Sequence, residues 1–480
     1  MITSTMADVR WVCISDLHFG AENSVLSRIP DGEMSVDPSA PSEVMKQLVV
    51  CLRQLVETNK DGVLPTLVLH GDILEFALSE DNIAAMTFAS FLELAFGSGS
   101  HIFDDTIYYV PGNHDHHLWE TARERQFAKY VYDLAPTDQI EPPSHTTPMF
   151  EDDTSSTPEA ALVNALLKRI GKPNLLCKVV YPNLGLENRD RNRVVVIHHG
   201  HFTEPLYRLI SDMKVELFPV QPPGKNVEDW ETSNFAWIDF FWSTLGRSGT
   251  AGADVGLIYD MLQEDSAVQV LADNLARFCV SKFQRLRYFR RLLLFGLTQI
   301  ARRSVPRLAE RERGVTNTVL GDSTAKGLVA YLVTPVHAQL ESEGPGATGR
   351  DVTFVFGHTH KPFERSEQVA GYARHVSILN SGGWVVDTQT TNEFQGGAVV
   401  AIDDECSVAS IRMYNQNDYQ TRIAESGSAA DRAFQAHLSN QLDFGTAPWT
   451  TFASAVKAAV DNRHNLLPQL IARGIDLAGG

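Results

Sequence analysis

Residues 106–117 read TIYYVPGNHDHH, and the fold can be worked out from this stretch outward. The first five residues are an apolar run with β-branched and aromatic side chains, which is typical of a buried strand. The run ends in Pro-Gly-Asn, which is ordinary turn chemistry. Three histidines and an aspartate in the same turn are not ordinary, and they predict a functional site at the end of this strand.

Two strands further upstream are predicted to end in the same way. VRWVCIS (9–15) runs into DLHFG, and TLVLH (66–70) runs into GD. Helical spacing of apolar residues predicts helices at 43–58, 80–96 and 118–133. Alternating strands and helices, with polar residues at the carboxyl end of each strand, predict an α/β sheet that carries its ligand site at that edge.

The strand pattern resumes later in the chain. We expect strands at 175–181, 193–200, 351–358, 375–381, 396–403 and 407–414. Between them, about 140 residues look mainly helical, which is far longer than an ordinary loop.

The predicted organisation is therefore a core in two parts, 1–203 and 351–420, with a helical insertion at 204–350 and a helical tail at 421–480. The insertion leaves the core after one histidine motif and returns just before another. We therefore expect it to cover the strand ends as a cap.

Composition limits the possible functions. The chain has 480 residues, 43% of them hydrophobic, and a formal net charge of −18, which argues against a protein that clamps duplex nucleic acid by its phosphates. The five cysteines are scattered, without a C-x-x-C pair, so a disulfide scaffold or a thiolate zinc site is not expected. The N-terminus has no apolar signal core, and no window approaches the ~18 apolar residues of a membrane span. We expect a soluble, cytoplasmic protein without a transmembrane segment.

Histidines are concentrated at the predicted strand ends. The segments 16–18, 114–117, 198–201 and 358–360 hold nine of the 16 histidines in 14 residues, where an even distribution would place fewer than one. Neutral imidazole and carboxylate are the ligands of first-row divalent metals. In a D-x-H string in extended backbone both side chains lie on the same face. The strings therefore predict a metal site, and an aspartate could bridge two ions through its two oxygens.

In order along the chain, the strings are D-x-H (16–18), G-D (71–72), G-N-H-D (112–115), H-G (199–200) and G-H-x-H (357–360). This ordered set resembles the calcineurin-like metallophosphoesterase family, over 9–203 and 351–414 but not over the insertion or the tail. The resemblance implies a four-layer αββα sandwich of two mixed β-sheets, in the α/β (α+β) class, around a binuclear metal centre.

The resemblance also implies roles for individual residues. Asp16, His18 and His360 would bind one metal ion, Asp72 would bridge, and Asn113, His199 and His358 would bind the other. His114 would face the substrate and protonate the leaving oxygen, with Asp115 orienting it. The other histidines of the motifs could line the substrate pocket: His116, His117, His198 and His201. His198 or His201 could also replace His199 as the ligand.

The predicted function is hydrolysis of a phosphodiester, pyrophosphate or phosphomonoester bond by a hydroxide bound at a centre of two divalent ions such as Mn, Fe or Zn. GDILEF and GNHDHH differ from the GDxxDRG and GNHE strings of phosphoprotein phosphatases. The strings GDxxE, GHTHKP and NSGGW resemble the UDP-2,3-diacylglucosamine pyrophosphatase branch, where Arg usually stands in place of His114. A lipid-linked or nucleotide phosphoester is therefore the expected substrate.

Two rival functions stay open, and so does the role of one basic stretch. The chain could be a nuclease of the same fold, or a non-catalytic scaffold that keeps the fold for protein binding. The stretch 276–307 is basic and apolar, and could contact an anionic ligand or the surface of a membrane. Its arginines could equally well pair with the many carboxylates of the chain.

Overall fold

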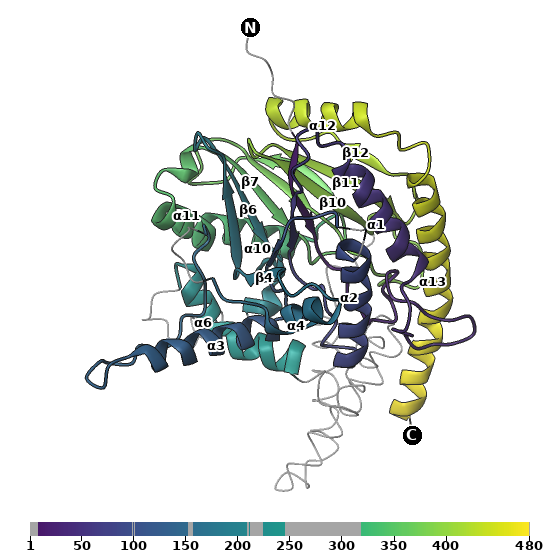
Figure 1. The fold of residues 1–480 in the computed structure, drawn as a ribbon, viewed down its shortest axis with the longest axis horizontal. Helices are drawn as coiled ribbons and strands as arrows, with labels where there is room; N and C mark the ends of the chain where they lie inside the picture. Colours follow the sequence, from purple (N-terminus) through teal and green to yellow (C-terminus); the bar gives the residue numbers. More distant parts are fainter. Residues whose placement is uncertain are drawn as a thin grey trace, which may run out of the picture.

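The computed structural model describes residues 8–479, apart from 98, 100, 152–156, 209–210, 212–223 and 245–317. Two mixed β-sheets form its centre (Figure 1). The larger sheet has seven strands in the order β12-β11-β10-β1-β2-β3-β4, in which β1 to β4 run parallel. Their bounds are β1 Val9–Ile14, β2 Thr66–Leu69, β3 Thr106–Tyr109, β4 Leu176–Val179, β10 Gly396–Asp403, β11 Val408–Asn415 and β12 Arg422–Ala424.

The smaller sheet has five strands in the order β5-β6-β7-β9-β8. Strands β6, β7 and β9 run parallel, and the two outer strands pair antiparallel to them. Their bounds are β5 Asn183–Glu187, β6 Arg193–His198, β7 Asp351–Phe356, β8 Phe363–Glu367 and β9 Val376–Asn380.

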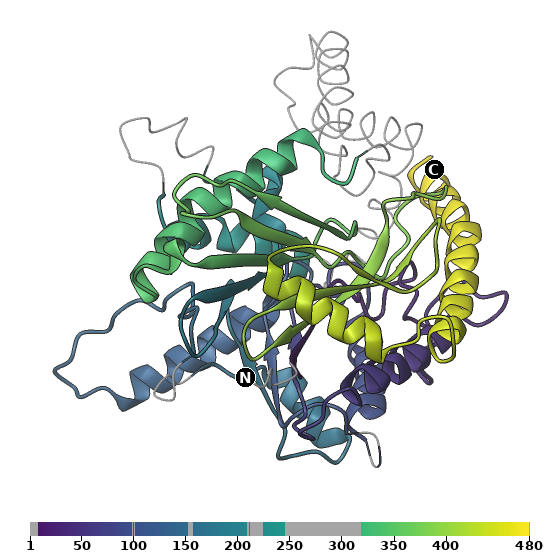
Figure 2. The ribbon, with the colours of Figure 1, turned by 90° about the horizontal axis from the view of Figure 1, so that it is seen from above.

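Helices cover the outer face of each sheet (Figures 1 and 2). On the larger sheet they are α1 Glu43–Val56, α2 Asp81–Phe96, α3 His117–Asp133, α4 Ala161–Arg169, α12 Ala429–Gln441 and α13 Trp449–Gly479. On the smaller sheet they are α6 Val227–Ile238, α10 Asp322–Tyr331 and α11 His337–Glu343, with the short helices η1 His201–Thr203, η2 Pro205–Arg208, η3 Asp239–Thr244, η6 Leu332–Val336 and η7 Ala347–Gly349.

Strand alternation separates the interior into layers. In β1, Val12 and Ile14 pack under α1 and α2, whereas Cys13 between them faces the other sheet. In β6, Val194 and Val196 pack under α10, and Val195 faces the larger sheet. Because successive side chains of a strand point to opposite faces, each buried strand contributes side chains to two hydrophobic cores. The predicted α/β sandwich of two mixed sheets is confirmed.

The sequence prediction missed four elements, namely α4, β5, β8 and β12. The three strands are all edge strands, and FERSE in β8 is largely polar. Edge strands bury less apolar surface and often carry charge, so their pattern is weak. The tail does contain two helices, and α13 packs beside α1 (Figure 1). The stretch 276–307 lies outside the described residues, and the division into a core and a cap stays a prediction.

Candidate metal centre

The predicted ligands meet at one edge of the sandwich. Strands β1, β2 and β3 run parallel in one sheet, β6 and β7 run parallel in the other, and each is followed by one histidine or aspartate motif. The carboxyl ends of parallel strands lie at the same edge of a sheet, so the five motifs come together there. All seven predicted ligand side chains are buried.

One group of ligand atoms comes from Asp16, His18 and His360. The Nε2 atoms of the two histidines lie 3.2 Å apart, and His360 Nε2 lies 3.3 Å from Asp16 Oδ1. The three residues can direct one ligand atom each at a common point. They are the residues that the resemblance implies for the first metal ion.

A second group comes from Asn113, His199 and His358. His199 Nε2 lies 3.1 Å from Asn113 Oδ1 and 3.1 Å from His358 Nδ1. His199 therefore fits the ligand position better than His198 or His201, which contribute to none of the ligand groups in the described part of the chain.

Asp72 lies between the two groups. Its Oδ2 is 3.2 Å from His199 Nε2 and 3.8 Å from His18 Nε2, while its Oδ1 accepts a hydrogen bond from the backbone N–H of His114. Asp72 can complete a group with His199 and His358, and another with His18 and His114. A carboxylate in this position has the geometry needed to bridge two ions.

The backbone is strained at these residues. Within the described part of the chain, seven non-glycine residues have a positive φ, and five of them are predicted ligands: Asp16, His18, Asp72, His358 and His360. Such conformations cost free energy and concentrate at functional sites. A second constraint is space, since a Cβ on Gly112 would lie 2.3 Å from Asp72 Oδ1, and one on Gly357 would lie 2.0 Å from Asp16 Oδ2. Both glycines permit a close approach of ligand side chains to the backbone.

Two of the buried carboxylates, Asp16 and Asp72, are held in their charged form. Burial alone would raise the pKa of Asp16, but the His360 and His199 imidazoles outweigh it and lower this pKa below its usual range. Burial likewise opposes the lowering at Asp72, where His199 and His114 keep the pKa well below the ordinary value. The donor set thus fits divalent cations, because it offers anionic oxygens and imidazole nitrogens in a pocket without water contact.

Carboxylates also contact the outer nitrogen of several histidines, that is, the ring nitrogen that is not directed at the ligand cluster. Glu75 is fully buried and contacts two rings, with Oε2 2.6 Å from His18 Nδ1 and Oε1 2.7 Å from His114 Nδ1. Asp387 Oδ2 lies 2.5 Å from His360 Nδ1, and Glu204 Oε1 lies 3.2 Å from His358 Nε2. Such partners fix the tautomer and the orientation of a ligand histidine.

The structure gives Asp115 different partners from those expected. Its carboxylate accepts hydrogen bonds from the backbone N–H groups of Gly112 and Ile73 and from the hydroxyl of Tyr109. Glu75, and not Asp115, contacts the His114 imidazole. The expectation that Asp115 orients His114 is therefore wrong in this geometry, and Asp115 instead braces the loops that carry Asp72 and Asn113. The GDxxE string, in which Glu75 lies three residues after Asp72, was the available signal for Glu75.

The remaining histidines lie around the centre rather than in it. His116 is buried against Phe235, and its Nδ1 lies 3.5 Å from Asp239 Oδ1. His198 and His201 are fully buried, and burial lowers the pKa of both rings well below the usual value. His117 is about one third exposed. His117 is thus the one exposed side chain among these four histidines.

Part of the predicted insertion covers the centre. The Trp242 ring lies 5.4 Å from the His114 ring, and Ser243 Oγ donates to the carbonyl oxygen of Asn113. Tyr207 packs on His358, with ring centroids 5.1 Å apart. These aromatic rings shield the ligands from water. No sequence signal distinguished them from ordinary apolar residues.

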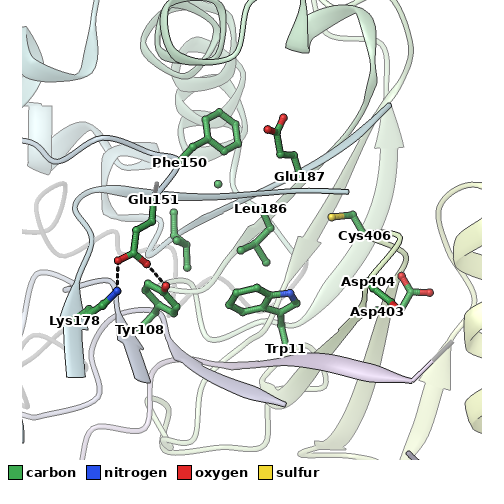
Figure 3. Close-up of a pocket in the computed structure, with 12 residues that line it drawn as sticks. Trp11, Tyr108, Phe150, Glu151, Lys178, Leu186, Glu187, Asp403, Asp404 and Cys406 are labelled. Carbon is green, nitrogen blue, oxygen red and sulfur yellow. Dashed lines mark hydrogen bonds and ion pairs between the residues drawn. The ribbon is translucent and has the colours of Figure 1, made fainter. Parts of the chain in front are cut away.

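The opposite end of the sandwich has its own cavity, of about 480 Å³ (Figure 3). Trp11 and Leu186 form its walls, one from each sheet, and Lys178 and Tyr108 contact Glu151 on one side. Asp403 lies at the other side, where burial raises its pKa to about 6. The cavity holds no histidine, which separates it chemically from the metal-type cluster.

Comparison with known proteins adds no identification, because the chain matches no protein-family model and no curated protein is detectably similar to it. The family resemblance thus stays a prediction from the motifs. Among the described helices, none combines the length and the apolar character that crossing a bilayer requires.

Proposed function

We propose that the chain is a metal-dependent phosphoesterase, which hydrolyses a phosphodiester, pyrophosphate or phosphomonoester bond. The observation that carries the proposal is the position of Asp72, whose Oδ2 lies within 4 Å of His199 Nε2 on one side and His18 Nε2 on the other. Two divalent ions of the Mn, Fe or Zn type, held by the two ligand groups, would withdraw charge from a phosphoryl group and acidify a bound water.

His114 is the residue proposed to donate a proton to the leaving group. Its Nδ1 is occupied by Glu75, so its Nε2 points toward the centre, 3.9 Å from Asp72 Oδ2. A charged imidazole held in this way can donate the Nε2 proton to the leaving oxygen, and the anionic Glu75 stabilises that charge. Trp242 covers the ring and keeps bulk water away from this proton.

The proposed substrate is a small phosphoester, lipid-linked or nucleotide in character. A nuclease and a non-catalytic scaffold remain the rival functions. A scaffold would have no need for strained ligand residues or for carboxylates on the outer histidine nitrogens, which supports the catalytic proposal.

Metal analysis and a substrate panel test the proposal. Purified protein reconstituted with Mn²⁺ or Zn²⁺ is expected to retain about two ions per chain. It should then hydrolyse one of four substrates: bis(p-nitrophenyl) phosphate, p-nitrophenyl phosphate, a nucleotide-linked lipid pyrophosphate or single-stranded DNA. His114→Ala is expected to keep its metal and lose turnover by about 10²–10⁴-fold. A chain that retains no metal after reconstitution would rule out the mechanism, and preference for single-stranded DNA would favour the nuclease.

A further inference from the structure

A second cavity lies beside the metal centre, between the N-terminal halves of α2, α3 and α4. Its volume is about 550 Å³, within the range of small-molecule sites. Most of its wall is apolar and comes from Phe76, Ala85, Leu118, Leu162 and Ala165. The turn that carries Phe76 and three separate helices supply these side chains, so the cavity is a feature of the fold and not of one loop.

Two residues that line the cavity are close in sequence to residues of the metal centre. Phe76 lines it and directly follows Glu75, the carboxylate that contacts His18 and His114. His117 lines it as well, three residues after His114, at the start of α3. The segments that carry Glu75 and His114 therefore also supply side chains to the cavity.

Helix η3 covers both places at once. Asp239 Oδ1 lies 3.7 Å from His117 Nδ1, and the Trp242 ring, three residues further along η3, is tilted against the His114 ring. One short helix thus contacts both the histidine at the cavity and the histidine at the metal centre.

The charges of the lining indicate what the cavity can hold. Arg125 and Asp81 are its two formally charged residues at neutral pH, and they have opposite signs. A nearly neutral, mostly apolar wall is a poor site for a second phosphate but suits an uncharged apolar group. Charged groups are instead concentrated at the metal centre.

We infer that this cavity binds the apolar ester group of the substrate, an aryl or short alkyl group, while the phosphoryl group lies at the metal centre. The inference rests on the proposed function and narrows it to phosphoesters that carry a compact apolar group. His117, at the junction of the two places, contacts the substrate between its phosphoryl group and its apolar group. Binding in the cavity also fixes which ester oxygen faces His114.

Non-hydrolysable ligands test the cavity separately from catalysis. We would measure the Kd of phenylphosphonate and methylphosphonate for the full, Mn²⁺-loaded chain by calorimetry. Burial of the phenyl ring predicts that phenylphosphonate binds at least tenfold more tightly. Ala165→Trp, an exposed position on α4 at the cavity, should remove this preference. Ala458→Trp, an exposed position on α13, is the matched control and should keep it.

A second variant distinguishes loss of the cavity from misfolding. Ala85→Phe narrows the cavity from α2 and should give the same loss as Ala165→Trp, with unchanged metal content and circular dichroism. Equal affinities of the two phosphonates for the unaltered chain would overturn the inference, and so would a preference that survives both substitutions. If the preference is present but no phosphoester is hydrolysed, the proposed function fails while the cavity stands as a ligand site.

Discussion

Asp16 and Asp72 at one end of the sandwich, and Asp403 at the other, are all buried, yet their pKa values move in opposite directions. At the metal-type end, neighbouring imidazoles overcome the effect of burial and keep the pKa of both carboxyls below the usual range. At the far end burial prevails and raises the pKa of Asp403 to about 6.

The difference shows what the histidines do before any ion binds. Removing an anionic carboxylate from water is costly, and the group normally becomes neutral unless a positive partner compensates. Histidine rings supply that compensation to Asp16 and Asp72, which therefore stay charged and able to bind cations. Burial and the charge of Asp72 instead raise the pKa of Asp115 at the same end. No histidine lines the cavity of Figure 3, and burial there raises the pKa of Asp403.

The largest effect is expected from removing the charge of Asp72. Asp72→Asn keeps an oxygen for the backbone N–H of His114 but lacks the anion between the two ligand groups. We expect bound Mn²⁺ to fall from about two ions per chain to one or fewer, with activity reduced by more than about 10³-fold. Elemental analysis after desalting measures the metal. The same substitution at Asp404, exposed at the far end, is the control and should change neither quantity.

The second largest effect is expected from removing the charge of Glu75. Glu75→Gln places an amide against His18 or His114, since one carboxylate now accepts from both rings. We expect metal affinity to fall by about 10–100-fold and the pH profile of kcat to shift, because His114 loses its anionic partner.

Asp115→Asn serves as the comparison for Glu75→Gln. Its partners are mainly backbone N–H groups and Tyr109, so we expect a lower Tm with the pH profile unchanged. A shifted profile in Asp115→Asn together with a normal one in Glu75→Gln would restore the role that the sequence suggested for Asp115.

The sequence was sufficient to predict which histidines and aspartates meet at this edge, because each motif is local. Asp16 with His18, and His358 with His360, are close neighbours in the chain and follow strands with a clear apolar pattern. The partners of the outer nitrogens were harder to find, since Asp387 lies 27 residues after His360 and no spacing rule connects them. The edge strands β5, β8 and β12 were missed for a related reason, because pairing partners rather than local pattern determine them.

A smaller effect is expected at Asp387, which contacts a single ligand histidine. Asp387→Asn should weaken the group of Asp16, His18 and His360 by about tenfold in metal affinity and leave the group of His199 and His358 unchanged. Stepwise removal of Mn²⁺ by a chelator resolves the two affinities. Asp418→Asn, at an exposed position, is the matched control. An equal loss at both positions would show that the two ligand groups are not independent.

The smallest effect is expected at the far end, in stability rather than activity. A buried acid with a raised pKa contributes stability that is full below the unfolded pKa of 3.8 and is lost as the pH rises through about 6. Asp403→Asn retains an oxygen for the backbone N–H groups of Glu405 and Ser407 and cannot ionise. Relative to the unaltered chain it should gain about 1–3 kcal/mol between pH 4.5 and pH 8.

Urea unfolding at the two pH values measures this gain, and Asp404→Asn should show none because its side chain is exposed. A gain that is the same at both pH values would mean that Asp403 remains charged in the folded chain. The contrast between the two ends would then not depend on the histidines, since a buried carboxylate would stay ionised without them.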